Sequence, residues 1–400
     1  MTQHTPIPLR EYGQREQNRE RQGDAVQPFQ VRVSIRERIR HFTWAWYTLT
    51  MSTGGIAFML HEAPYQFNGL HTIGAAIFIL DLVLFLLVTT MILTRFVLFP
   101  GTLTQTLEHP TELLFIPTFY MTIASLIPCA ERYGVPHTGP WLITALRVLF
   151  WLYLASSFLT AITQYHLLFT AKGLTVQSMT PAWILPILPT VLAGNVASAI
   201  AGSQPFHHAI PIIIAGFAFQ GLGITTTCFM FSNYLSRLMS YGLPAPGARS
   251  GMFIAVGPPS YTASGFIGMA NAALAAFPEM LATGTSDLPN AQVLKSVAVF
   301  VALPLWTLGL FFFSLSLAAV LSEARTQRFQ LSWWSYVFPT VGWILATISI
   351  GTTFQSQVIL WTATIAAVLQ FVMWIVVGVA HVMAVWRGDI CWPGKDEDRD

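Results

Sequence analysis

Residues 357–386 read QVILWTATIAAVLQFVMWIVVGVAHVMAVW, a stretch without a single Asp, Glu, Lys or Arg. A membrane helix needs roughly 20 consecutive, mostly apolar residues, and this stretch exceeds that length. The uncharged region is longer still, since it begins at Phe329, and a second one extends from Gly173 to Ser236. Soluble domains do not contain uncharged stretches of this length. The sequence therefore indicates an α-helical membrane protein.

The composition of the whole chain agrees with this interpretation. Of its 400 residues, 54% are hydrophobic and 10% are charged, whereas soluble globular proteins contain about 25% charged residues. This balance excludes a soluble enzyme, a nucleic-acid-binding protein and a disordered scaffold. Three cysteines, Cys129, Cys228 and Cys391, are too few for a secreted disulfide framework.

Ten segments are long and apolar enough to be membrane helices. They are predicted at 41–60, 71–95, 111–131, 140–168, 180–201, 207–236, 250–277, 294–322, 333–353 and 357–386. The predicted fold class is thus an all-α polytopic membrane protein with ten transmembrane helices.

The positions of the cations predict the orientation. Cytoplasmic flanks of membrane proteins carry an excess of Lys and Arg. If residues 1–40 are cytoplasmic, 17 of the 20 cations lie on cytoplasmic flanks, two (Arg132 and Lys295) lie outside, and Arg147 lies within a span. We therefore expect a cytoplasmic tail at 1–40 with a basic amphipathic helix near 30–40, a transport domain at 41–387 and a cytoplasmic tail at 388–400.

Helix breakers are concentrated in the odd-numbered spans. Such residues free backbone groups that lipid cannot satisfy, so broken helices are tolerated where they are buried in protein or line water. We therefore expect five helical hairpins, with an inner ring of broken odd helices around a central pore and an outer ring of even helices; simple proline kinks are the alternative. The breakers are Gly54-Gly55, Pro117, Pro128, Pro186, Pro189, Gly194, Gly257-Pro258-Pro259, Pro339 and Gly342.

Two charged residues lie deep within spans, where charge is costly and usually paired. Asp81 and Arg147 are predicted at similar depths in the second and fourth spans. We expect them to neutralise each other, directly or through a polar bridge. The alternative is that Arg147 binds an anion.

Anion binding does not require a deep cation, because helix N-termini carry about half a positive charge. The segments Ser52-Thr53-Gly54-Gly55 and Gly257-Pro258-Pro259 are candidates to present such amides to an anion, with Arg95 and Arg249 attracting anions to the cytoplasmic mouth. The sequence contains no enzyme signature and no cysteine pair at metal spacing. We therefore expect no catalytic residues, no metal and no cofactor.

Six motifs resemble those of the fungal malic-acid permeases, and the resemblance extends over about residues 36–398. These permeases belong to the tellurite-resistance/dicarboxylate transporter superfamily, which includes the plant slow anion channels. The motifs are RHFTWAW (40–46) leading to MSTGG (51–55), PAWILP (181–186), FQGLG (219–223), GMF (251–253) with VGPP (256–259), WW (333–334) with FPT (338–340), and PGKDED (393–398).

The resemblance implies ten helices around a pore in each subunit, occluded by a phenylalanine that corresponds to Phe338. It also implies a plasma-membrane transporter of malate, succinate and related four-carbon dicarboxylates, and we expect a homo-oligomer with one pore per subunit. Ser52, Tyr261-Thr262 and Thr340 depart from the permease pattern. Protons remain candidate co-substrates, and a sulfite or other small-anion exporter and an intramembrane enzyme are the alternatives.

Overall fold

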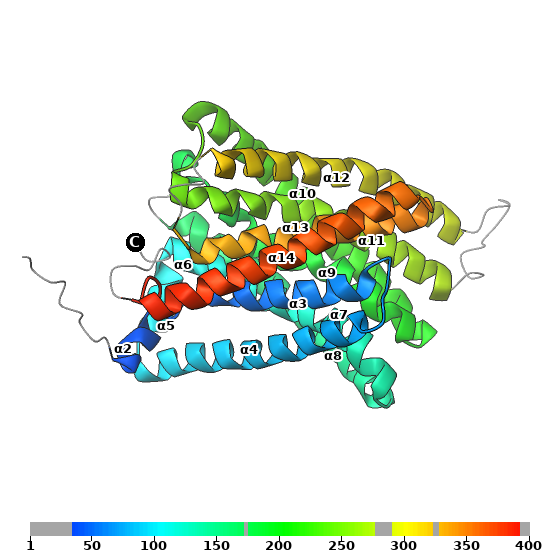
Figure 1. Cartoon of the computed structure of the whole chain (residues 1–400), viewed down its shortest axis with the longest axis horizontal. Coiled ribbons are helices and arrows are strands. Elements are labelled where there is room, and N and C mark those ends of the chain that lie inside the picture. The colour runs from blue at the N-terminus through cyan, green and yellow to red at the C-terminus, as the bar shows by residue number, and fades with distance from the viewer. Residues whose placement is uncertain (1–33, 172–174, 277–289, 323–327, 393–400) are drawn as a thin grey trace, which may run out of the picture. The chain divides into compact units, whose positions relative to one another are not determined.

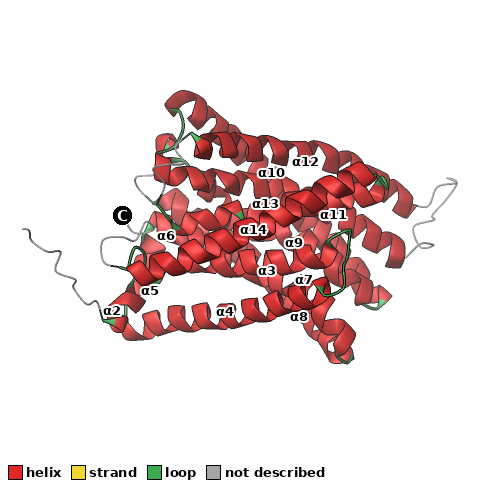
Figure 2. Ribbon diagram, in the orientation of Figure 1, coloured by secondary structure: helices red, strands yellow, loops and turns green. Residues whose placement is uncertain are grey.

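A computed structural model describes residues 34–171, 175–276, 290–322 and 328–392. These residues form helices and loops only, with no strand in the described ranges (Figure 2). Helix α2 (Ile35–Arg40) is the described part of the basic helix predicted near 30–40, whose other residues lie outside these ranges. Contacts divide the chain into Met1–Glu37 and Arg38–Asp400, and all that follows concerns the second unit.

Eight helical segments in the described residues are long and apolar enough to cross a membrane. Five are single α-helices, each close to a predicted even-numbered span: α4 (Leu70–Leu98), α8 (Pro140–Thr170), α10 (Phe206–Tyr241), α12 (Asn290–Leu321) and α14 (Gln357–Arg387).

Three of the eight segments are composites of shorter helices. One joins α6 (Pro110–Phe115), α7 (Pro117–Cys129), a π-helical turn at Ala130–Gly134 and a 3-10 turn at Val135–His137. The other two each change from a 3-10 helix to an α-helix: η5 (Pro181–Ile187) leads into α9 (Leu188–Ile200) and a 3-10 turn at Ala201–Ser203, and η8 (Leu331–Tyr336) leads into α13 (Phe338–Thr353).

The two remaining predicted spans also form helices, although they are not among these eight segments. The 3-10 turn η1 (Trp44–Trp46) leads into α3 (Tyr47–Glu62), and the 3-10 helix η7 (Pro246–Val256) leads into α11 (Gly257–Ala276). Short helices α5 (Thr102–Glu108) and η4 (Val176–Ser178) complete the described elements.

Burial separates the helices into two groups. In the most apolar part of each segment, 89% of the residues are buried in 181–203, 72% in 331–353 and 67% in 110–137. The corresponding fraction is 22% for α4, α12 and α14. The exposed side chains of this second group are large and apolar, as at Leu86 and Trp361, which suits a surface that faces lipid rather than water.

The buried helices contact one another in a closed cycle: α3 packs against α7, α7 against α9, α9 against α11, α11 against α13, and α13 against α3. The exposed helices cover this cycle, since α4 packs on α3, α8 on α7 and α9, α10 on α9 and α11, α12 on α11, and α14 on α13 and α3. Figure 1 shows the long helices α4, α10 and α12 running in similar directions, with α14 crossing obliquely.

The predicted break at Gly54-Gly55 is wrong, because α3 continues through both glycines. Glycine lowers helix stability by only about 1 kcal/mol, which close packing outweighs. Most of the predicted proline breaks lie at helix beginnings instead: Pro117, Pro189 and Pro339 occupy the first or second position of α7, α9 and α13. A proline is tolerated there because the amide it lacks has no helical partner.

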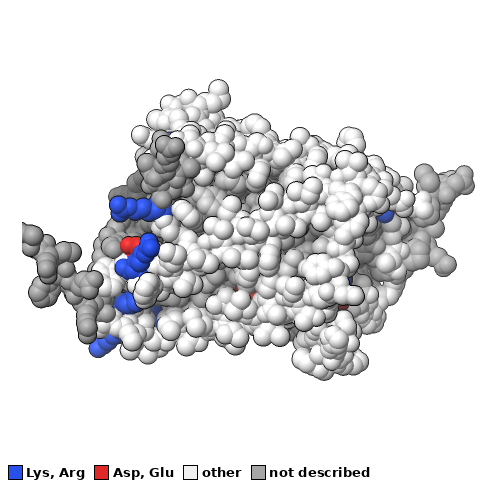
Figure 3. All heavy atoms as spheres, in the orientation of Figure 1, with Lys and Arg blue, Asp and Glu red and all other residues white. Residues whose placement is uncertain are grey.

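Basic side chains gather at one end of the molecule. Arg95 and Arg387 lie in the last turns of α4 and α14. On the face shown in Figure 3, most Lys and Arg side chains lie at the end where these two helices finish.

Candidate functional site

Three cavities follow one another between the buried helices. The first cavity has a volume of about 260 Å³, the middle cavity about 30 Å³ and the far cavity about 310 Å³. Leu192, Tyr261 and Phe338 line both the first and the middle cavity. The middle and far cavities share Phe58, Asn195 and Leu345. The cavities therefore form a single line, with its narrowest part at the middle cavity, whose volume is about that of one water molecule.

The first cavity lies where the five buried α-helices begin. Its walls include the first or second residue of α3, α7, α9, α11 and α13, namely Thr48, Thr118, Leu188, Gly257 and Phe338. The N-terminal end of an α-helix carries a partial positive charge. Five such ends around one cavity favour an anion without any cationic side chain.

The side chains of the first cavity are mostly apolar. None of the described residues that line it is Asp, Glu, Lys, Arg or His. Thr111, Thr180 and Ser332 add hydroxyl groups to the wall. The cavity therefore offers an anion neutral donors and helix ends in an apolar setting, in which electrostatic interactions are stronger than in water.

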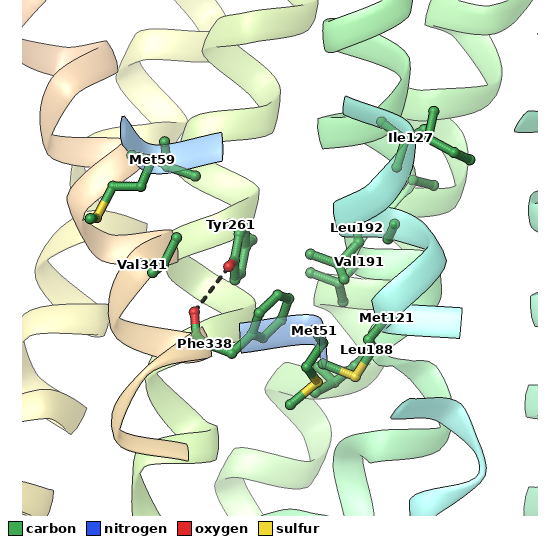
Figure 4. Packing of buried hydrophobic residues seen from close by; sticks show 14 of the residues in the cluster. Met51, Met59, Met121, Ile127, Leu188, Val191, Leu192, Tyr261, Phe338 and Val341 are labelled. Carbon is green, nitrogen blue, oxygen red and sulfur yellow. Dashed lines mark hydrogen bonds between the residues drawn. The ribbon is translucent and has the colours of Figure 1, made fainter. Parts of the chain in front are cut away.

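Phe338 lines the boundary between the first and the middle cavity. Its side chain is buried and lies beside the ring of Tyr261, with centroids 5.0 Å apart. Figure 4 shows both residues among Leu188, Leu192 and Met121. On the neighbouring helix α3, a Cβ atom at Gly55 would lie 3.4 Å from Cδ2 of Phe338, an ordinary van der Waals distance, so α3 packs beside the ring.

The far cavity is polar and carries charge. Nε of Arg132 lies 2.9 Å from Oε1 of Glu62, and both side chains are about one-third exposed. These residues lie in the π-helical turn after α7 and at the last residue of α3. The other polar lining residues are Asn195, Ser198, Ser264, Asn271, Ser349 and Thr352.

Of the residues predicted to form the pore, five line these cavities: Gly55, Gly257, Pro258, Phe338 and Pro339. The other six do not line any of the three: Ser52, Thr53, Gly54, Pro186, Pro189 and Pro259.

Two of these six have a clear packing role instead. Thr53 donates to the carbonyl of Leu49 and accepts a hydrogen bond from Nε1 of Trp374. Ser52 donates to the carbonyl of Trp334 across 3.4 Å. Their hydroxyls therefore connect helices and do not present donors to the cavities.

The predicted anion-attracting role of Arg95 does not match its position. The side chain is fully buried and its Nη1 lies 2.6 Å from Oε1 of Glu112. The same nitrogen donates to the carbonyl of Phe42. Arg249 is likewise engaged, because its guanidinium donates to Ser322 and to the carbonyls of Pro244 and Ala319. Neither arginine lines the three cavities.

The predicted pairing of Asp81 with Arg147 is wrong. Neither carboxylate oxygen of Asp81 has a hydrogen-bond partner among the described residues. Asp81 is on the buried face of α4, which packs on α3, whereas α8 packs on α7 and α9. Similar depth in the membrane does not place two side chains on facing sides of their helices.

Sequence reasoning missed Tyr261, Asn195 and the pair of Glu62 and Arg132 as site residues. Their shared signal is position: each lies within or at the end of an odd-numbered, buried span. Among the described residues there is also no cluster of three or more His, Cys, Asp or Glu side chains arranged for a metal ion.

Comparisons with known proteins point to transport. The sequence profile of a family described as voltage-dependent anion channel matches residues 41–382. A malic acid transport protein of Schizosaccharomyces pombe is 33% identical over 92% of this chain and 83% of its own length. A putative malic acid transport protein of the same organism is 34% identical, with 92% and 85% covered. A sulfite efflux pump of Trichophyton rubrum is 29% identical, with 85% and 89% covered.

Proposed function

Because this chain belongs to the voltage-dependent anion channel family, we propose that it transports malate and related four-carbon dicarboxylates such as succinate. The family and its relatives are transporters or channels rather than enzymes. The observation that carries the proposal is the line of three cavities, of which the first is bordered by the beginnings of five helices and has Phe338 at its boundary with the middle cavity.

The proposed architecture has ten membrane crossings, arranged as five hairpins. The closed cycle of α3, α7, α9, α11 and α13 supports an inner ring around the pore, and the exposed apolar faces of α4, α12 and α14 support an outer ring. Helix α3 has 16 residues and helix α11 has 20, and each continues a 3-10 segment, η1 or η7, which adds length to the crossing.

We assign the transport domain to 41–387, with tails 1–40 and 388–400 on the cytoplasmic side of the plasma membrane. The basic end formed by the last turns of α4 and α14 supports this orientation. On this assignment the first cavity opens toward the cytoplasm and the far cavity toward the outside. We further propose a homo-oligomer with one pore per subunit, as in the resembled permeases.

In this mechanism a dicarboxylate enters the first cavity and is held by the positive ends of the helix dipoles and by hydroxyls. It then passes Phe338 and leaves through the far cavity. Because the middle cavity has room for about one water molecule, a four-carbon acid passes only when Phe338 moves. Malate's own carboxyl groups titrate, so pH changes the concentration of each ionic form of malate and makes the flux pH-dependent even without a proton relay in the protein.

Efflux of sulfite or another small anion is the second candidate. The similarity to the sulfite efflux pump and the small volume of the middle cavity favour it. A three-oxygen anion needs less movement of Phe338 than a four-carbon acid does.

Uptake into liposomes distinguishes the two. The purified chain is reconstituted, and the initial uptake of labelled malate, succinate and sulfite is compared with that of protein-free liposomes, with and without a pH gradient. We expect malate and succinate to enter faster than sulfite. Movement of sulfite alone would establish the second candidate, and the absence of any dicarboxylate uptake would refute the first.

A further inference from the structure

Tyr261 contacts Phe338 through both its ring and its hydroxyl. The hydroxyl donates to the main-chain carbonyl of Phe338 across 2.9 Å. The two rings have centroids 5.0 Å apart and an interplanar angle of 30°. Figure 4 shows the hydrogen bond, with Tyr261 on α11 facing the first turn of α13. A single side chain therefore contacts both the backbone and the ring of the residue at the boundary between the first and the middle cavity.

The backbone of Tyr261 is itself held from two other helices. Its carbonyl accepts hydrogen bonds from Nδ2 of Asn195 across 2.8 Å and from Nε2 of Gln220 across 3.0 Å. Gln220 reaches α11 through gaps at two glycines, since a Cβ at Gly194 or Gly265 would overlap its amide. Residues of α9 and α10 thus fix the position of Tyr261.

Gly342 provides the space for the Tyr261 ring on α13. A Cβ atom at Gly342 would lie 2.6 Å from Cδ2 of Tyr261, closer than real Cβ contacts permit. The ring therefore lies directly on the α13 backbone, one helical turn after Phe338. Because Tyr261 also lines both the first and the middle cavity, it forms part of the narrow passage itself.

We propose that Tyr261 is a latch that holds Phe338 across the passage, so that an anion passes only when the contact between these two residues is broken. This inference rests on the proposed transport function and adds a residue that regulates it. If only apolar ring contacts held Phe338 in place, it could move without breaking any hydrogen bond. The hydrogen bond to the main-chain carbonyl keeps the Tyr261 ring beside the Phe338 ring and restrains the first turn of α13, and displacing Tyr261 would leave a buried polar group unpaired, which is costly.

Tyr261→Phe tests the latch, since it removes the hydroxyl and keeps the ring. We expect a rise of about three- to tenfold in the initial rate of malate uptake, the range that the loss of one buried hydrogen bond gives. The matched control is Tyr133→Phe. Tyr133 is also buried, and its hydroxyl donates to the carbonyl of Ala57 across 2.8 Å on α3, away from Phe338. We expect no rise for this variant.

The same substitution in a Phe338→Ala background separates a latch from a merely structural role. Without the Phe338 ring, Tyr261→Phe has no closed gate to release, so we expect the double variant to match Phe338→Ala. Equal changes in both backgrounds, or no change in either, would overturn the proposal. All rates are compared per folded protein inserted, as measured by monodisperse elution and protease protection in the liposomes.

A second measurement does not depend on the transported substrate. Ala124→Cys places a thiol on the wall of the middle cavity, and a charged thiol reagent is added on the side of the first cavity. Mass spectrometry of the labelled peptide gives its rate of modification. We expect Tyr261→Phe to raise this rate and Tyr133→Phe to leave it unchanged; equal rates refute the latch. Absence of malate uptake by the wild-type chain would refute the proposed function alone.

Discussion

Arg95 and Glu112 form an ion pair with 2.6 Å between Nη1 and Oε1, and both side chains are buried. The hydroxyl of Thr106 donates to the same carboxylate oxygen across 3.0 Å, so α4, α5 and α6 meet at this pair. A buried pair of this kind connects the helices. Each of its two charges is stabilised by the other, because both are removed from water.

Breaking this pair should destabilise the protein strongly. Glu112→Gln leaves a buried guanidinium without its counter-charge, which typically costs about 3–5 kcal/mol. The expected result is a clear fall in the midpoint of thermal unfolding in detergent. Glu108→Gln on the exposed face of α5 is the control and should change little. Replacing both partners by leucine should restore much of the loss; if Glu112→Gln alone were harmless, the pair would have no structural role.

Gly54 allows α3 to approach α4 and α7 closely. A Cβ atom at Gly54 would lie 2.5 Å from Oδ2 of Asp81 and 2.5 Å from Oγ of Ser125. Gly54→Ala should therefore overpack this contact and destabilise the protein by about 1–3 kcal/mol. The control is Gly221→Ala on α10, where nothing lies within 4 Å of the new methyl group. We expect no loss of stability for Gly221→Ala, because alanine has a higher helix propensity than glycine. Similar unfolding midpoints for the two variants would contradict the packing at Gly54.

The long spans could be predicted from sequence, because length and apolar content depend on local composition alone. The uncharged stretch at residues 357–386 corresponds closely to α14. Helix breakers were harder to place. Prolines occur in the buried spans, but Pro189 and Pro339 lie at helix beginnings rather than within helices, and Gly54-Gly55 does not interrupt α3. Glycine and proline mark positions where the backbone can depart from a regular helix. Packing determines whether a helix breaks, begins or continues there.

The site was predictable only in part. Phe338, Gly55 and Gly257 lie on cavity walls, because they belong to the buried spans, and their role in a pore stays a prediction. The structural role of Arg95 could not be predicted, because its partner Glu112 lies in a different helix and nothing in the sequence indicates that the two residues form an ion pair. Tyr261 was noticed only as an unusual residue, since its contact with Phe338 depends on how α11 and α13 face each other.

Asp81 and Arg147 should contribute independently to stability. Because the carboxylate of Asp81 has no hydrogen-bond partner among the described residues, Asp81→Asn removes no ion pair. In a double-mutant cycle with Arg147→Gln, the coupling free energy should stay below about 0.5 kcal/mol, as for distant sites. Thermal unfolding of the four proteins measures it. A coupling above about 1 kcal/mol would restore the pairing that the structure does not show.

Glu62 and Arg132 should change anion flux in opposite directions. Glu62→Gln leaves the guanidinium of Arg132 uncompensated in the far cavity and should raise malate flux about twofold or more, whereas Arg132→Gln should lower it. Both effects should shrink as salt is added, because each side chain is about one-third exposed. Uptake at low and high ionic strength gives the comparison, with Glu108→Gln as the control. If both substitutions changed the anion flux in the same direction, loss of the ion pair between Glu62 and Arg132 would explain the effect, rather than the charge of either side chain.

Phe338→Ala should raise malate flux about tenfold, as would a reduction of roughly 1.4 kcal/mol in the barrier, because it removes the ring that lines both the first and the middle cavity and that we propose as the gate. The same change also deletes a buried aromatic side chain, which typically costs about 3–5 kcal/mol of stability. Phe150→Ala is the matched control: this ring is fully buried on α8 and lines none of the three cavities. It should destabilise the protein similarly without raising uptake into liposomes, measured per folded protein. If both variants raised flux equally, the increase would reflect a loosened core; if Phe338→Ala did not raise it, Phe338 would not be the barrier.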